Sequence, residues 1–250
     1  MKLTDKIELY NEDCMQVMSR YPDKYFDLAC VDVPYGIDAS NDARGGKQHG
    51  NAIAPSKSYG AKSWDDECPP QEYFDELIRV SKNQIVWGAN HFISRIPRDS
   101  SCWIVWDKVT GNNNYADCEL AWTSFETAVR QFTFMWKGMF QENMRNKEER
   151  IHPTQKPVAL YDWIFKNYAI CPACENKGWI WLTMGKQTDC PKCKGEIPKI
   201  LDTHGGSMSS VISADKAGLE MVCCELDKEY FDKAVDRFNK YKSQNVLEFK

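Results

Sequence analysis

The segment at positions 30–37, CVDVPYGI, places a carboxylate and an aromatic ring at the end of an apolar run. The run ends at Asp32, and Val33, Pro34, Tyr35 and Gly36 follow it. Such residues are ordinary ways for a chain to leave a strand and turn, so alone they predict a loop rather than a site. A functional interpretation, in which the carboxylate accepts hydrogen bonds and the ring stacks on a ligand, needs support from other segments.

Four cysteines carry a second kind of chemistry. Two Cys-Pro-x-Cys knuckles, with 15 residues between them, supply Cys171, Cys174, Cys190 and Cys193. Four thiolates form the closed tetrahedral set of a structural zinc site, and they leave no coordination position open for catalysis. The segment resembles half of a DnaJ-type zinc module. Incidental cysteines or a redox pair are the alternatives, and the spacing argues against both.

A third segment, DTHGGSMSS at 202–210, is a glycine loop that follows an apolar run. Glu225 comes about 20 residues later, at the end of the next apolar run. A glycine loop lets a cofactor approach the backbone, and an acid at this spacing binds ribose hydroxyls. The pair therefore indicates a nucleotide-type cofactor, although a glycine loop alone is weak evidence.

The elements that must position these segments alternate along the chain. Apolar runs predict strands at 6–11, 26–33, 83–90, 101–108, 199–206 and 221–227, and helical spacing predicts helices at 70–82, 157–169 and 228–243. This order predicts an α/β fold, a doubly wound, mostly parallel sheet with helices on both faces and a small zinc-binding insertion. Ligands of such sheets bind at the carboxyl ends of the strands, where Asp32, Asp202 and Glu225 lie.

Composition restricts the class of protein. The chain has 250 residues and a formal net charge of −4, and it has no apolar run long enough to cross a membrane. Its beginning lacks the apolar stretch of a signal peptide, so we expect a cytoplasmic, intracellular protein with reduced thiols. Residues 43–64 contain four cations and no acid, which favours a flexible loop that contacts phosphates. A solvated surface loop is the alternative.

Together with HPTQKP at 152–157, these segments resemble the DNA amino-methyltransferases, which methylate adenine N6 or cytosine N4 with S-adenosylmethionine. The Asp-x-Pro-Tyr segment comes first, HPTQKP later and the glycine loop last, as in the permuted branch called beta. The resemblance covers nearly the whole chain outside the cysteine segment. It implies a methyltransferase domain of residues 1–169 and 198–250, with a zinc-knuckle insertion at 170–197.

The resemblance implies a catalytic segment of Asp32, Val33, Pro34 and Tyr35. The Asp32 carboxylate and the Val33 carbonyl would accept the two N–H bonds of the target amine, which aims its lone pair at the methyl group. Tyr35 would stack on the base after it flips out of the duplex. Family members usually have proline where this chain has Val33, so we expect the same geometry with less rigidity.

The resemblance also implies a set of residues around the cofactor. These are Asp13, Cys14, Asp32, His152, Thr154, Lys156, Asp202, Gly206, Ser207 and Glu225. Three of them have structural alternatives: Asp13 as a helix cap, His152 as a turn residue and Asp202 as an organiser of its loop. Met208 replaces the usual second glycine of the loop. If its φ is positive, methionine is strained there, and we expect weak cofactor binding that glycine would tighten.

The leading hypothesis is therefore an adenine-N6 DNA methyltransferase. Asp rather than Ser at position 32 favours adenine over cytosine N4, by resemblance only. Other hypotheses are an RNA substrate and a degenerate relative that binds DNA or a partner. Because a linker between a helix and a parallel strand lies at the amino ends of the strands, we expect the zinc knuckle far from the chemistry. Its role would be contact with DNA or with a second subunit in a homodimer.

Overall fold

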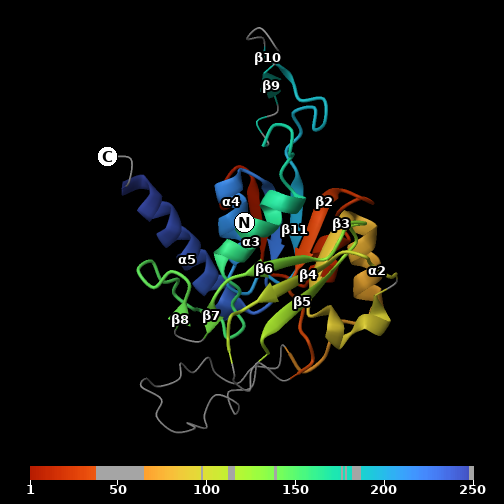
Figure 1. Ribbon diagram of the computed structural model, residues 1–250, viewed down its shortest axis with the longest axis vertical. Helices are drawn as coiled ribbons and strands as arrows, with labels where there is room; N and C mark the ends of the chain where they lie inside the picture. The colour runs from red at the N-terminus through yellow and green to blue at the C-terminus, as the bar shows by residue number, and fades with distance from the viewer. Residues whose placement is uncertain are drawn as a thin grey trace.

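The protein, seen in a computed structural model, is built around one eight-stranded sheet (Figure 1). The structure describes residues 1–37, 65–96, 98–111, 116–137, 140–175, 177, 179–181 and 187–247. All the strands and helices predicted above are present. The sheet strands are β1 (Ile7–Tyr10), β2 (Phe26–Val31), β3 (Ser81–Trp87), β4 (Trp103–Asp107), β5 (Cys118–Thr123), β6 (Arg130–Thr133), β11 (Lys199–Asp202) and β12 (Glu220–Cys224).

The order across the sheet is β1-β12-β11-β2-β3-β5-β4-β6, and only β5 among these strands runs opposite to the rest. From β11 the chain moves outward through β12, and from β2 it moves the other way through β3. The carboxyl ends of β11 and β2 are therefore neighbours at the point where the winding reverses. Such a switch point leaves a crevice in which ligands bind.

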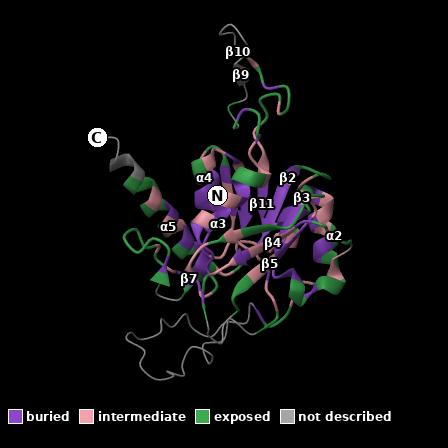
Figure 2. Cartoon of the chain, viewed as in Figure 1, coloured by how far each residue is buried: buried purple, intermediate pink, exposed green. Residues whose placement is uncertain are grey.

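Helices cover both faces of the sheet. One face carries α3 (Val158–Tyr168), α4 (Ser209–Ala217) and α5 (Lys228–Leu247), and the other carries α1 (Cys14–Met18) and α2 (Gln71–Val80). Strand β2 shows why both cores form: Leu28 and Cys30 pack in the first core, while Ala29 and Val31 pack in the second. Successive side chains of a strand point to opposite faces. The central strands β2, β3 and β11 are mostly buried, as Figure 2 shows, whereas β6 at the edge is mostly exposed.

Short elements complete the described chain. They are the 3₁₀ turns η2 (Ala89–His91) and η3 (Ile93–Arg95), the hairpin of β7 (Trp136–Lys137) and β8 (Phe140–Gln141), and the hairpin of β9 (Trp179–Trp181) and β10 (Gln187–Asp189). The β9–β10 hairpin projects from the amino end of the sheet, opposite the end from which the chain leaves β2 (Figure 1). Among the described residues, no helix is long and apolar enough to cross a membrane.

Candidate active site

Asp32 lies at the carboxyl end of β2, in a turn that buried side chains hold in place. Val33 sends its side chain into the core beneath α2. The Asp65 carboxylate is buried, and its Oδ1 accepts hydrogen bonds from the backbone N–H of Tyr35 (2.6 Å) and of Gly36 (3.1 Å). Cys68 donates from Sγ to the Tyr35 carbonyl, 2.9 Å away. Packing of the Val33 side chain and the hydrogen bonds to Asp65 therefore hold the turn in place.

The Asp32 carboxylate is the centre of a hydrogen-bonded group. Its Oδ1 accepts from Lys156 Nζ at 2.7 Å and from the Tyr35 hydroxyl at 2.8 Å, and Lys156 also donates to the Tyr35 oxygen at 3.1 Å. The structure thus brings the Asp-x-Pro-Tyr and HPTQKP segments together, although 124 positions separate Asp32 from Lys156. Burial raises the pKa of Asp32 above its usual value, although the Lys156 ammonium opposes that shift.

Glu119, which the sequence analysis does not single out, extends this group. Its Oε2 lies 2.8 Å from Lys156 Nζ, and its Oε1 forms an ion pair with Lys108. Burial would raise the pKa of Glu119, but the ammonium groups of Lys156 and Lys108 lower it to about 2. A single acid within the apolar strand β5 is the signal that could have identified Glu119, because a buried charge needs a partner.

The Tyr35 ring rests on the loop that follows β3. It stacks on the His91 ring with centroids 5.1 Å apart and an interplanar angle of 14°. Gly88 lies beneath it with φ +71°, and a Cβ there would come within 2.0 Å of Tyr35 Cε1. Gly88 and His91 are further residues that the sequence analysis does not single out. They fix the ring whose hydroxyl contacts Asp32.

We expect Gly88→Ala to destabilise the protein more than Gly111→Ala. Both glycines have positive φ, so each substitution carries a similar backbone cost of about 1 kcal/mol. Only at Gly88 does the added Cβ overlap another residue, since nothing lies within 4 Å of the Cβ position at Gly111. The overlap should cost a further 1–3 kcal/mol, roughly, in the free energy of unfolding measured by urea titration. Equal losses in the two variants would show that Gly88 does not support Tyr35.

The glycine loop lies across the crevice, at the end of β11. Glu225, at the end of β12, accepts from the Gly206 N–H through Oε2 at 2.7 Å. Asp202 accepts from the Ser210 hydroxyl at 2.6 Å and from the His204 N–H at 3.1 Å, so it organises the loop. Burial, and then the negative charges of Asp32 and Glu225, raise the pKa of Asp202 to about 7.

The remaining predicted cofactor residues surround this loop. Asp13 caps α1, accepting from the N–H groups of Met15 (2.9 Å) and Gln16 (3.2 Å), and its second role beside the cofactor stays a prediction. Burial, with the charges of Asp13 and Glu225 nearby, raises the pKa of Cys14 to about 12. The cap and the thiol therefore lie on the Glu225 side of the crevice.

His152 connects HPTQKP to the glycine loop. Its ring lies about 3.8 Å from the Cβ position of Gly206 and packs against Tyr230, with centroids 4.3 Å apart. Burial lowers the pKa of His152 to about 3, so the ring is neutral. Thr154 is exposed, with its hydroxyl 3.1 Å from His152 Nδ1. Ser207 is buried, and Arg237 donates to its carbonyl at 2.7 Å.

Met208 has the positive φ that the sequence analysis left as a condition. Its φ is +54° and its ψ is 36°, the left-handed region that favours glycine. Its side chain, however, is completely buried in the core between the sheet and α4. The methionine therefore combines a backbone cost with a packing gain.

We expect Met208→Gly to be less stable than wild type, and Met208→Ala to be less stable still. Loss of the buried side chain costs about 2–5 kcal/mol in either variant. Glycine then recovers about 1 kcal/mol because it tolerates the positive φ. Thermal unfolding of the three proteins tests this order. A glycine variant no more stable than the alanine variant would show that the backbone at Met208 is not strained. Tighter cofactor binding by the glycine variant stays a prediction.

The four predicted metal ligands form one cluster. All their Sγ atoms lie within 4.8 Å of one another, with 3.8 Å between those of Cys171 and Cys190 and 3.4 Å between those of Cys174 and Cys193. Sulfurs that bind one tetrahedral zinc at 2.3 Å lie about 3.8 Å apart. The cluster therefore fits a zinc ion. Cys171 and Cys193 line the same cleft as Asp27 at the amino end of β2, whereas Asp32 follows the carboxyl end of that strand.

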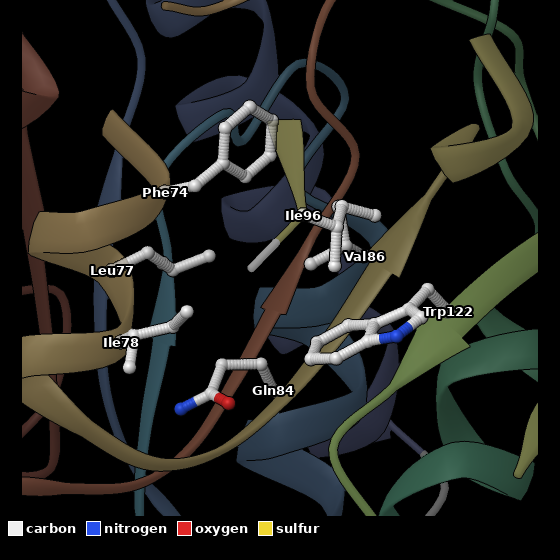
Figure 3. Close-up of a pocket in the computed structure, with 7 residues that line it drawn as sticks. All are labelled: Phe74, Leu77, Ile78, Gln84, Val86, Ile96 and Trp122. Atoms are coloured by element: carbon white, nitrogen blue, oxygen red, sulfur yellow. The ribbon is translucent and has the colours of Figure 1, made fainter. Parts of the chain in front are cut away.

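A small cavity between α2 and the sheet is unrelated to this site. Its lining side chains include Leu77, Val86 and Trp122, which face one another across it (Figure 3). Its volume of about 10 Å³ matches roughly one water molecule, so it cannot hold a cofactor. The predicted basic loop at 43–64 lies outside the described residues.

Comparison with known proteins identifies the fold. No protein-family profile matches the sequence. The PvuII DNA methyltransferase (cytosine-N4-specific) matches with a TM-score of 0.52 and 11% identity, over 94% of this chain and 87% of that one. A proposed DNA modification methylase from Thermus thermophilus matches with a TM-score of 0.51 and 13% identity, over 93% of this chain and 94% of that one. The structure of that methylase in complex with S-adenosyl-L-methionine matches with a TM-score of 0.51 and 14% identity, over the same fractions of the two chains. The chain therefore has the Rossmann-like methyltransferase fold.

Proposed function

We propose that the protein transfers a methyl group from S-adenosylmethionine to the exocyclic N6 amine of adenine in DNA. One observation carries the proposal: Asp32, fixed beside Tyr35 and Lys156, faces the glycine loop at the switch point of the sheet. The similar solved structures support it, since one is a cytosine-N4-specific DNA methyltransferase and another was solved with S-adenosyl-L-methionine. Because the first of these acts on cytosine, cytosine N4 is the alternative acceptor.

The glycine loop fits such a cofactor. A Cβ at Gly205 would lie 2.6 Å from Cys223 Sγ, so only glycine lets the loop close onto β12. The loop leads into α4, and Glu225 stands beside it at the end of the neighbouring strand. We propose that Glu225 binds ribose hydroxyls, with Asp13 and Cys14 toward the adenine. Gly206, Ser207 and Thr154 would border the methionine part. When bound, the cofactor supplies an electrophilic methyl group on a sulfonium.

The protein's own groups act on the amine that receives the methyl group. An exocyclic amine is a poor nucleophile because its lone pair is delocalised into the ring. Asp32 and the Val33 carbonyl would accept its two N–H bonds and favour a tetrahedral nitrogen. Within the described chain, the hydrogen bonds to Asp32 end on Oδ1, so we assign Oδ2 to the amine. Fixing the two acceptors in advance lowers the entropic cost of the step.

A nucleobase can reach Asp32 only after it leaves the stack of the duplex. We propose that the flipped base lies on the face of Tyr35 opposite His91, because His91 holds the other face. The basic loop at 43–64 would contact phosphates. The zinc knuckle, as a separate insertion at 170–197, would add contacts with DNA or with a second subunit in a homodimer.

The experiment is to incubate duplex DNA with the protein and S-adenosylmethionine, digest it to nucleosides and identify methylated products by mass spectrometry. N6-methyl-2′-deoxyadenosine in the digest supports the proposal, and N4-methyl-2′-deoxycytidine supports the alternative. The same assay on single-stranded RNA tests the third class of substrate. No binding of the cofactor in calorimetry, by wild type or by Met208→Gly, would favour a degenerate relative, the hypothesis that Met208 motivates.

A further inference from the structure

The contacts of Lys156 raise a question about Asp32 that the proposed function leaves open. Lys156 is almost fully buried, and its ammonium bonds to the same carboxylate that we assign to the substrate amine. A buried ammonium paired with a single carboxylate holds it strongly, because low dielectric strengthens the attraction. Such a pair would compete with a neutral amine for Asp32.

The structure shows why the pair is not isolated. Lys156 lies between two carboxylates, 2.7 Å from Asp32 Oδ1 and 2.8 Å from Glu119 Oε2. Its contact with Glu119 is an ion pair, so Glu119 attracts the ammonium through charge. Lys108 pairs with the other oxygen of Glu119 and lies over the Trp106 ring, 5.2 Å from its centroid. The result is a row of alternating charges: Asp32, Lys156, Glu119, Lys108.

We infer that Glu119 and Lys108 are positioning residues that weaken the attraction between Lys156 and Asp32. Lys156 still orients the Asp32 carboxylate, and Asp32 remains a strong hydrogen-bond acceptor for the substrate amine. Glu119 weakens the attraction between Lys156 and Asp32 because its own negative charge pairs with the same ammonium. Lys108 limits this effect because its positive charge pairs with the other oxygen of Glu119. The inference rests on the proposed function for the identity of the substrate, but the charge row itself does not depend on it.

The two positioning residues have opposite effects on Asp32. The Glu119 charge raises the pKa of Asp32 and the Lys156 charge lowers it, after burial as the largest cause. Among the described residues, the other charged or titratable groups near Asp32 are Tyr35 from its own turn, Asp202 from β11, Tyr161 from α3 and Cys30 from β2. None of these is changed in the variants below, so their contributions stay constant.

The test titrates Asp32 directly in the full-length protein without ligand, by carbon NMR with aspartate labelled at the carboxyl carbon. The Asp32 signal is assigned by its loss in Asp32→Asn, and the Asp202 signal by its loss in Asp202→Asn. Glu119→Gln should lower the pKa of Asp32 by about one unit, because it removes the nearby negative charge. Lys108→Met should raise it, because Glu119 then acts unneutralised. Glu119→Asp, which keeps the charge, should stay near wild type.

Glu76→Gln is the matched control. It removes a carboxylate from an ion pair with Arg79 on α2, away from the site, and should leave the Asp32 signal unchanged. Circular dichroism checks that each variant is folded. An Asp32 pKa that does not move in Glu119→Gln, or that moves the same way in both variants, overturns the inference.

Turnover separates this inference from the proposed function. In saturating substrate, Glu119→Gln should lower kcat at least about tenfold, because the tightened Lys156 pair competes for Asp32. The affinity for cofactor should stay the same, and the acid limb of the kcat profile should move to lower pH with the pKa of Asp32. If the NMR shifts appear but wild type transfers no methyl group, the charge row stands and the proposed function fails. Normal kcat in Glu119→Gln with wild-type turnover present overturns the inference alone.

Discussion

Asp32→Ala will lower the rate of methyl transfer by roughly 10²- to 10³-fold or more, while the affinity for S-adenosylmethionine changes little. The reason is that the partner of Asp32 is the target amine, whereas the groups that we propose to bind the cofactor come mainly from other segments, such as the glycine loop and Glu225. The variant should stay folded, because the Lys156 ammonium retains its ion pair with Glu119. A tritium-transfer assay measures the rate, and calorimetry measures the affinity.

The strand that carries Asp32 also offers a control. Asp27 lies at the other end of β2, where it pairs with Lys82 and accepts from the Lys199 N–H. Asp27→Ala should keep wild-type turnover. Asp32→Asn keeps the shape but loses the charge, so activity close to wild type in that variant would mean that ionisation of Asp32 is not needed. Near-wild-type transfer by Asp32→Ala would refute the assignment of the active site.

Removing the zinc ligands should have the second large effect. We expect one zinc per chain, and Cys171→Ser together with Cys190→Ser should reduce the metal content to nearly zero. Structural zinc sites bind with apparent free energies of about 10–16 kcal/mol, and so short a segment cannot build a core of its own. Loss of zinc should therefore unfold the knuckle. Metal analysis after gel filtration measures the content, with Cys118→Ser, an exposed cysteine outside the cluster, as control.

The eight-stranded sheet and its helices should survive that loss, because the cluster lies beside the amino end of β2 and Asp32 follows its carboxyl end. Replacing residues 171–197 with a short Gly-Ser linker should leave the single-turnover rate of the chemical step near wild type. Weaker binding of duplex DNA, or loss of a dimer, would then report the contacts that the knuckle supplies. A lost chemical step in a variant that remains folded by circular dichroism would place the knuckle within the catalytic machinery.

Local patterns were enough to predict the main elements. The apolar runs at 26–33 and 199–206 predicted β2 and β11, and the helical spacing at 70–82 predicted α2. The antiparallel strand β5 and the helix α4 were not predicted. β5 contains a charged residue, Glu119. In α4 six consecutive residues, 209–214, are buried and three of them are serines, so its sequence shows no clear helical period of apolar residues. Both are stabilised by their neighbours more than by their own sequences.

The sequence by itself determined which residues could do chemistry and at which end of the sheet they would lie. Asp32, the glycine loop and Glu225 each follow an apolar run, and parallel strands bring their carboxyl ends to one edge. The spacing of the four cysteines likewise predicted that they form one cluster, because each Cys-Pro-x-Cys pair lies on a local turn. The loop pattern also marked Met208 as a departure from the usual glycine, and the structure then showed that its φ is positive.

Only the tertiary structure decided which of these groups meet and what they contact. Lys156 pairs with Asp32, and Glu119 joins them, because β2, β5 and the HPTQKP segment converge on one point from distant parts of the chain. Gly88 fixes the Tyr35 ring for the same reason. Such contacts depend on the order of strands across the sheet, which reverses between β11 and β2, and a local pattern carries no record of that order.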